Sequence, residues 1–268
     1  APLVVATPEA LLQRTLPKAL LLQTVHTLRV GEAHDLNELA DTLAAAGYVR
    51  CDQVEGVGQF ALRGGLLDLF SPAGDHPVRC EFFGDELDAM GAFDPATQRR
   101  VENLQSCDIL PVAEVLPQLA PGGWAGLTQA VDDLISQVKG SKGDHAAPLT
   151  TLAQDRERLS QGLSFPALDR YLALIYPAVA TAADYLPEDA LVCLAESPRV
   201  AERARNYLWR MEEDVKTLLE TGLVAGQAAR FTRSFEELMG VLEERPVVFL
   251  DTFPSSSYPL RPRTLLDV

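Results

Sequence analysis

Cysteine, methionine and tryptophan are scarce in this chain of 268 residues, which contains only four, three and two of them. The four cysteines lie far apart and form no Cys-X-X-Cys pair, which argues against a dense disulfide framework and against a zinc site. The four histidines share no metal-ligand spacing either. We therefore expect a chain that holds neither a metal nor a cofactor.

Basic residues are also few, since 23 Lys and Arg stand against 38 Asp and Glu and give a formal net charge of −15. This balance argues against a protein that mainly coats nucleic acid, because phosphate binding needs a basic face. A local basic patch stays open, at Arg99 and Arg100 or over 199–210. No apolar run approaches the roughly 20 residues that span a bilayer, and no secretory leader is evident. These absences predict a cytoplasmic protein with no membrane partner.

A phosphate-binding loop is missing as well. Such a loop ends in Lys followed by Ser or Thr, whereas the nearest candidate, at 140–144, has its lysine before the second glycine and no hydroxyl after it. The apolar run 191–194 leads to Ala195 and Glu196, and alanine stands where magnesium binding needs a carboxylate. No nucleophile motif or catalytic carboxylate pair is recognisable elsewhere. We therefore expect no catalytic residue, and a chain that is not an enzyme.

Three short apolar runs predict an α/β domain with a parallel sheet. Residues 3–6 form the first run, which leads into Thr7 and Pro8, an N-cap followed by proline at the first helical position. The runs 190–194 and 247–250 are each followed by an acidic residue and are typical of buried parallel strands. Only one strand–helix unit precedes the next change of pattern. We therefore expect a chain that begins within a domain and is a piece of a larger protein.

Helical periodicity dominates the region after Pro111. Apolar residues recur at helical spacing over 127–138, and the longest predicted helix runs over about 198–223.

A different pattern occupies the segment between about 28 and 112. Asp35 with Glu38 predicts a helix start, and Gly47 predicts its end. Runs at 53–54, 59–63, 66–70 and 78–83 then predict strands separated by turns rich in glycine and proline. We therefore predict three segments: 1–27 as the first part of an α/β domain, 28–112 as a small α+β domain with a mainly antiparallel sheet, and 113–268 as the helix-rich remainder of the α/β domain.

The predicted strand 78–83 has two faces of different chemistry. Alternation places Arg79, Glu81 and Phe83 on one face and an apolar set on the other, and the apolar set suits the core. An arginine and an aromatic exposed together have the composition of a protein-interface hot spot, and Arg63 could join them. The alternative is that Arg63 and Arg79 only pair with Asp68, Glu81 or Asp85, and such exposed pairs contribute roughly 0–1 kcal/mol.

Two stretches of this segment resemble a known family. They are GQFALRGGLLDLFSP at 58–72 and PVRCEFFGDELD at 77–88, which continues to FDPATQR at 93–99. Together they resemble the UvrA-binding domain that UvrB excision-repair proteins share with bacterial transcription-repair coupling factors. The likeness covers about 28–111, and residues 3–11 and 184–192 are similar to the flanking parts of both families. It implies a partial, degenerate RecA-like or P-loop-like parallel α/β domain interrupted by a UvrA-binding domain.

The departures favour the coupling factors. UvrB proteins hydrolyse ATP and carry Asp-Glu-Ser-His after the second strand, whereas residues 195–198 are Ala-Glu-Ser-Pro. The DNA-clamping hairpin of UvrB is also missing between Leu12 and Thr24. The chain is therefore most similar to the non-catalytic UvrB-homology module of that family.

The resemblance implies a role and a partner. The role is the recruitment of UvrA, with RNA polymerase and duplex DNA contacted through other parts of the full-length protein. In the family, positions matching Arg63, Arg79 and Phe83 meet UvrA, and for Glu81 a cross-strand pairing role is equally open. The alternative function is an ATP-dependent DNA-repair protein of the UvrB kind.

Overall fold

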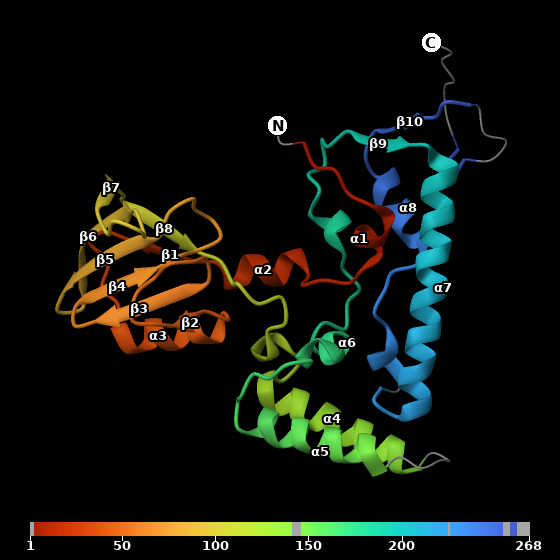
Figure 1. Ribbon diagram of the computed structural model, residues 1–268, viewed down its shortest axis with the longest axis horizontal. Coiled ribbons are helices and arrows are strands. Elements are labelled where there is room, and N and C mark those ends of the chain that lie inside the picture. Colours follow the sequence, from red (N-terminus) through yellow and green to blue (C-terminus); the bar gives the residue numbers. More distant parts are fainter. Residues whose placement is uncertain (1–2, 141–145, 225, 254–257, 262–268) are drawn as a thin grey trace. The chain divides into compact units, whose positions relative to one another are not determined.

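The computed structural model describes residues 3–140, 146–224, 226–253 and 258–261. Contacts divide the chain into two units, Ala19–Gln118 and a second unit that joins Ala1–Lys18 to Leu119–Val268. One unit is therefore a continuous segment of the chain, and the other is made of the segments before and after it. Figure 1 shows both units.

A six-stranded sheet forms the main part of the unit Ala19–Gln118. Its strand order is β2-β3-β4-β5-β6-β7, antiparallel throughout except for the parallel pair β2 and β3. The strands are β2 (Val49–Arg50), β3 (Gln59–Arg63), β4 (Leu66–Leu69), β5 (Val78–Phe83), β6 (Glu86–Phe93) and β7 (Arg100–Asn103). Two further strands, β1 (His26–Arg29) and β8 (Ser106–Ile109), pair antiparallel in a small sheet of their own.

One helix covers a face of the six-stranded sheet (Figure 1). The helix is α3 (Leu36–Ala45), whose first turn is capped by the Asp35 carboxylate, which accepts hydrogen bonds from the backbone N–H groups of Asn37 and Glu38. Gly47 follows its end with φ of +92°, and a Cβ there would lie 2.6 Å from that of Ala113, so only glycine fits this helix end. Leucines of α3 pack against the sheet in one core, which includes Leu39, Leu43, Phe60, Leu67, Leu69, Val78 and Cys80.

The second unit is mostly helical. Its helices are α1 (Pro8–Leu12), α4 (Gly123–Gly140), α5 (Ala146–Ser160), α6 (Leu172–Ile175), α7 (Ser197–Thr221) and α8 (Phe235–Glu243), with single 3-10 turns η2 (Leu168–Tyr171), η3 (Ala182–Tyr185) and η4 (Gly226–Ala229). Helix α2 (Lys18–Thr24) and the 3-10 turn η1 (Pro117–Leu119) include the two points of the sequence at which one unit gives way to the other. Strands β9 (Val192–Ala195) and β10 (Val247–Leu250) pair in parallel, and their inner residues form a core with α1, α7 and α8.

The α/β fold class predicted from the sequence is confirmed, with a parallel pair in one unit and a mainly antiparallel sheet in the other. The predicted strands 59–63 and 78–83 match β3 and β5. The long helix after Pro198 and the helix around 127–138 are confirmed as α7 and α4. The finer division into 1–27, 28–112 and 113–268 stays a prediction.

Two predicted strands are wrong. Residues 3–6 form no strand with any described segment, and Leu3, Val4 and Val5 are 91%, 71% and 89% exposed, because a strand needs a hydrogen-bonded neighbour as well as apolar side chains. Residues 53–54 are also outside the sheet. Val54 instead packs with Ala61 and Phe93 in a small apolar cluster. Local composition alone cannot distinguish a strand from a loop that packs on a sheet.

No helix in the described part of the chain is long and apolar enough to cross a membrane.

Candidate protein-binding surface

Strand β5 separates an apolar face from a polar one. Val78 and Cys80 are buried in the core, and Phe82 packs against it. Arg79 and Glu81 are half-buried on the opposite face, and Phe83 ends the strand 85% exposed. The face that carries the arginine and the aromatic is therefore the one turned away from α3.

A buried carboxylate lies at the centre of this polar face. Asp68 of β4 is directly opposite Arg79 of β5 in the antiparallel register, and its side chain is only 1% exposed. Arg79 donates from Nε at 2.7 Å and from Nη2 at 2.8 Å to the two carboxylate oxygens, and Arg63 donates from Nη2 at 2.6 Å. The hydrogen bonds to Asp68 raise the pKa of Arg79. Both guanidinium groups are therefore held by one carboxylate.

Further contacts fix the position of each arginine. Arg79 lies over the ring of Phe93, 4.7 Å from its centroid, and donates a third hydrogen bond to Gln98. Arg63 donates to the carbonyl oxygen of Asp52 at 3.1 Å. The side chains of Arg79 and Arg63 stay 24% and 47% exposed, so part of each side chain is open to solvent.

The sequence left open the alternative that Arg63 and Arg79 pair with a carboxylate on the sheet. Both arginines do form such pairs, and Asp68 is the acceptor in each. Glu81 does not join them, because it accepts a hydrogen bond from Arg100 of β7. Pairing and partner binding do not exclude each other here. A guanidinium group that a buried carboxylate holds in place loses less side-chain entropy when a partner contacts its exposed edge.

Phe83 and Leu66 add apolar area to this face. Leu66 is opposite Glu81 across β4 and β5 and is 36% exposed. Phe83 stands where β5 enters the turn to β6, which Gly84 makes with φ of +62°. We call Arg63, Leu66, Arg79 and Phe83 the arginine–phenylalanine face.

Sequence reasoning missed the exposed Leu66, and it named Asp68 only as one of three carboxylates that could pair with the arginines. Alternation along 66–69 could have placed both on the polar face, since Leu66 and Asp68 share one face while Leu67 and Leu69 are fully buried on the other. What alternation could not supply is the register that sets Asp68 beside Arg79.

The acidic residues after β9 and β10 are engaged in local structure. The Asp251 carboxylate accepts hydrogen bonds from the backbone N–H of Ser197, at 2.5 Å, and from its Oγ, at 2.8 Å, at the start of α7. Glu196 accepts from the backbone N–H of Thr252, at 3.3 Å, and from its hydroxyl group. Both carboxylates therefore join the ends of the two strands to α7. The candidate phosphate loop continues over 141–144, which lie outside the described residues.

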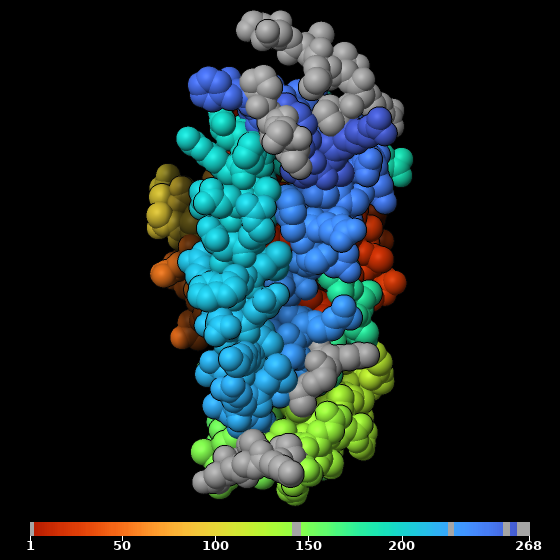
Figure 2. Space-filling view, turned by 90° about the vertical axis from the view of Figure 1, so that its right-hand side faces the viewer, coloured from red at the N-terminus to blue at the C-terminus, as the bar shows by residue number. Residues whose placement is uncertain are grey.

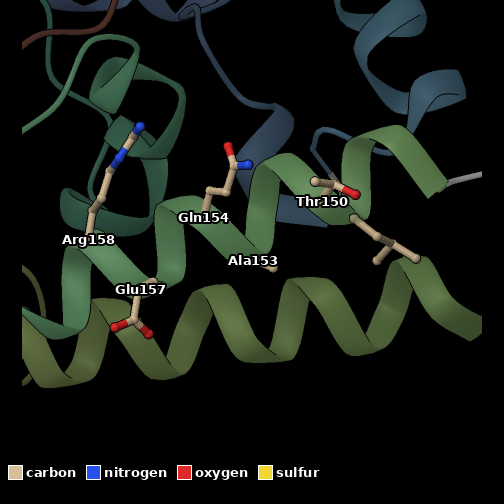
Figure 3. A pocket seen from close by; sticks show the side chains of 6 residues that line it. Thr150, Ala153, Gln154, Glu157 and Arg158 are labelled. Atoms are coloured by element: carbon tan, nitrogen blue, oxygen red, sulfur yellow. The ribbon is translucent and has the colours of Figure 1, made fainter.

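The surface also has a shallow hollow along α5 (Figure 3). It is lined by Leu149, Thr150, Ala153, Gln154, Glu157 and Arg158. None of the predicted site residues borders it, and its lining comes from a single helix. In the described part of the chain, no three His, Cys, Asp or Glu side chains are grouped so that they could hold a metal ion.

Comparison with known proteins shows which proteins this chain is similar to. Residues 26–114 match the UvrB interaction domain, so the whole arginine–phenylalanine face lies inside the matched segment. The chain is 30% identical over 272 residues to a transcription-repair-coupling factor of Bacillus subtilis, an alignment that covers 100% of this chain and 23% of that protein. One from Myxococcus xanthus is 33% identical over 214 residues, 78% of this chain and 17% of the relative. One from Staphylococcus aureus is 24% identical over 240 residues, an alignment that covers 86% of this chain and 19% of the relative. The chain thus spans less than a quarter of the length of these relatives.

Proposed function

We propose that this chain, a homologue over its whole length of part of the transcription-repair-coupling factors, is a non-catalytic module that recruits UvrA in transcription-coupled excision repair. The observation that carries the proposal is Phe83, 85% exposed at the end of the strand that carries Arg79, on a sheet face where a buried carboxylate holds two arginines in place, within the segment that matches the UvrB interaction domain. The contact residues are Arg63, Arg79 and Phe83, with Leu66 beside them. Glu81 serves mainly to hold Arg100.

The chemistry of the face suits a protein partner. Aromatic and arginine side chains contribute most of the binding energy in many protein interfaces, and those that are held in place before binding cost least to use. A net charge of −15 disfavours a nucleic acid as the main partner of this chain.

The remaining parts of the proposal concern the longer protein. ATP-driven work, RNA polymerase and duplex DNA are assigned to segments outside these 268 residues, and the site of action is the bacterial cytoplasm, where the DNA lies. The alternative of a UvrB-type motor predicts that the chain itself turns over ATP. Phosphate release above background by the purified chain would favour that alternative.

The direct test is Phe83→Ala in a calorimetric titration with purified UvrA. Loss of an aromatic anchor of a hot spot costs about 2 kcal/mol or more, so we expect binding at least roughly 30-fold weaker. The fold should not change, because the ring is exposed. Phe253→Ala is the matched control, since Phe253 is 79% exposed in the other unit and its loss should leave the affinity unchanged. An affinity of Phe83→Ala within twofold of wild type would overturn the assignment.

Variants of the two arginines can change the stability of the sheet as well as partner binding, so their effects are harder to interpret than those of Phe83→Ala. A reversal such as Arg79→Glu would set a second carboxylate against buried Asp68 and destabilise the sheet, so loss of binding would have two explanations. Arg63→Ala is cleaner because its side chain is nearly half exposed and Arg79 still neutralises Asp68. We expect Arg63→Ala to weaken UvrA binding and to leave unfolding cooperative.

A further inference from the structure

Helix α7 has an outer face that no described element covers. Its inner side packs on the core of its unit through Val200, Ala204 and Leu208. Figure 2 shows α7 as a continuous ridge along the surface that faces the viewer. The exposed residues that fall on one stripe of the helix, at about 100° per residue, are Glu202, Arg205, Asn206, Trp209, Glu212, Glu213, Lys216 and Glu220.

Trp209 stands in the middle of this stripe. It lies twelve residues from Ser197 and twelve from Thr221, the two ends of α7, and is 64% exposed. Tryptophan buries more apolar area than other side chains when it finds a partner, and it is enriched in interface hot spots. Trp209 thus offers a large apolar side chain at the centre of a charged stripe, and no described part of the chain covers it.

Two pairs of opposite charges flank Trp209 on the stripe. Arg205 precedes it by four residues and Glu212 follows it by three, which puts both on the same flank of the indole at about 100° per residue. Glu202 precedes it by seven and Lys216 follows it by seven. Each pair has opposite signs, and none of these four side chains forms an ion pair with a described residue.

This pattern is complementary to itself when it is reversed. An antiparallel second α7, related by a twofold axis at Trp209, brings Arg205 opposite Glu212 of the second copy, and Glu202 opposite Lys216 of the second copy. The two indoles then meet at the axis. A duplex DNA fits less well, because the acidic residues 212, 213 and 220 lie on the same stripe as Arg205.

We propose that α7 is a self-association surface on which two copies of this chain pair antiparallel across Trp209. This inference is independent of the proposed recruitment of UvrA, since it uses another unit and another face. One helix pair buries little area and a single large apolar side chain from each copy. The dimer is therefore weak and forms at concentrations on the order of 10⁻⁵ to 10⁻³ M.

The first test is sedimentation velocity of the 268-residue chain over that concentration range. We expect a sedimentation coefficient that rises with concentration for the wild type and stays at the monomer value for Trp209→Ala. Phe83→Ala removes another exposed aromatic and should dimerise like the wild type. A wild type that stays monomeric over the range would overturn the proposal.

Charge reversal tests the antiparallel register. Arg205→Glu and Glu212→Arg each set like charges opposite one another, so each alone should weaken self-association at least tenfold. A mixture of the two variants restores opposite charges at both contacts and should form a heterodimer. Arg210→Glu is the matched control, because it is exposed but lies about 100° around the helix from Trp209. Equal self-association of all variants would show a different interface and would contradict the register.

Fluorescence reports the environment of the anchor directly. The chain has two tryptophans, so Trp124→Phe leaves Trp209 as the only one. Its emission should shift to shorter wavelength as concentration rises, because the indole leaves water at the axis. Emission that does not move while the protein dimerises would exclude Trp209 from the interface.

Discussion

At the scale of single residues, Asp68 organises the candidate binding surface without being part of it. Its side chain is 1% exposed and accepts three hydrogen bonds from two arginines. A buried carboxylate is stable only with such partners, because losing hydration costs more than one ordinary hydrogen bond returns. Arg63 and Arg79 therefore stabilise the buried carboxylate, and the carboxylate fixes the position of both guanidinium groups.

We predict that Asp68→Ala lowers both stability and partner binding. The change leaves two guanidinium groups without their acceptor, and because both are partly exposed we expect a loss of roughly 2 kcal/mol of unfolding free energy. UvrA binding should weaken although Asp68 cannot touch a partner. Urea denaturation and calorimetry measure the two effects.

Asp88→Ala is the control for that variant, since Asp88 is an exposed carboxylate on β6 and its loss should change stability by less than about 0.5 kcal/mol. Wild-type stability of Asp68→Ala would show that the carboxylate does not hold the two arginines.

At the scale of elements, local rules predicted the helices better than the strands. Thr7 and Asp35 cap their helices as predicted, and α7 ends at Gly222 in the left-handed conformation. A helix contains its own hydrogen bonds, so its ends depend on nearby residues. A strand depends on a distant neighbour, which is why residues 3–6 and 53–54 failed as strands despite suitable composition.

The cap of α8 provides a test at this scale. The Ser234 hydroxyl accepts from the N–H of Glu237, and the Glu237 carboxylate accepts from the N–H of Ser234, a reciprocal capping box. We expect Ser234→Ala to cost about 1 kcal/mol of unfolding free energy, measured by urea denaturation at pH 7. No measurable cost would mean that α8 depends only on its packing.

The same cap makes stability depend on pH. The backbone hydrogen bond from Ser234 lowers the pKa of Glu237 in the folded state. Its contribution is therefore present above the unfolded pKa of about 4.3 and is lost as pH falls through the folded pKa. The stability difference between wild type and Glu237→Gln should be larger at pH 7 than at pH 3. An equal difference at both pH values would contradict this role.

At the scale of the whole molecule, the two units have separate cores. The core of Ala19–Gln118 is built from α3, the six-stranded sheet and strands β1 and β8, all within that unit. Chains of about 100 residues can fold alone when they hold such a core. We therefore expect the arginine–phenylalanine face to form in this segment without the other unit.

We predict that the fragment Ala19–Gln118 folds by itself and binds UvrA with the affinity of the full chain. Circular dichroism with a cooperative urea transition tests folding, and calorimetry tests binding. The same fragment with Phe83→Ala controls for specific binding. A folded fragment that fails to bind would mean that the partner surface needs the other unit.

Residue order was enough to predict the α/β class, the two faces of β5, the long helix α7 and the family likeness of 28–111, because periodicity and short motifs act over a few residues. It could not show that one carboxylate holds both arginines, since Asp68 reaches Arg79 only through the register of β4 with β5. Nor could it show that the Trp209 side of α7 is the uncovered one. Which face of an element is buried depends on what packs against it, and that packing is set by contacts between residues far apart in the chain.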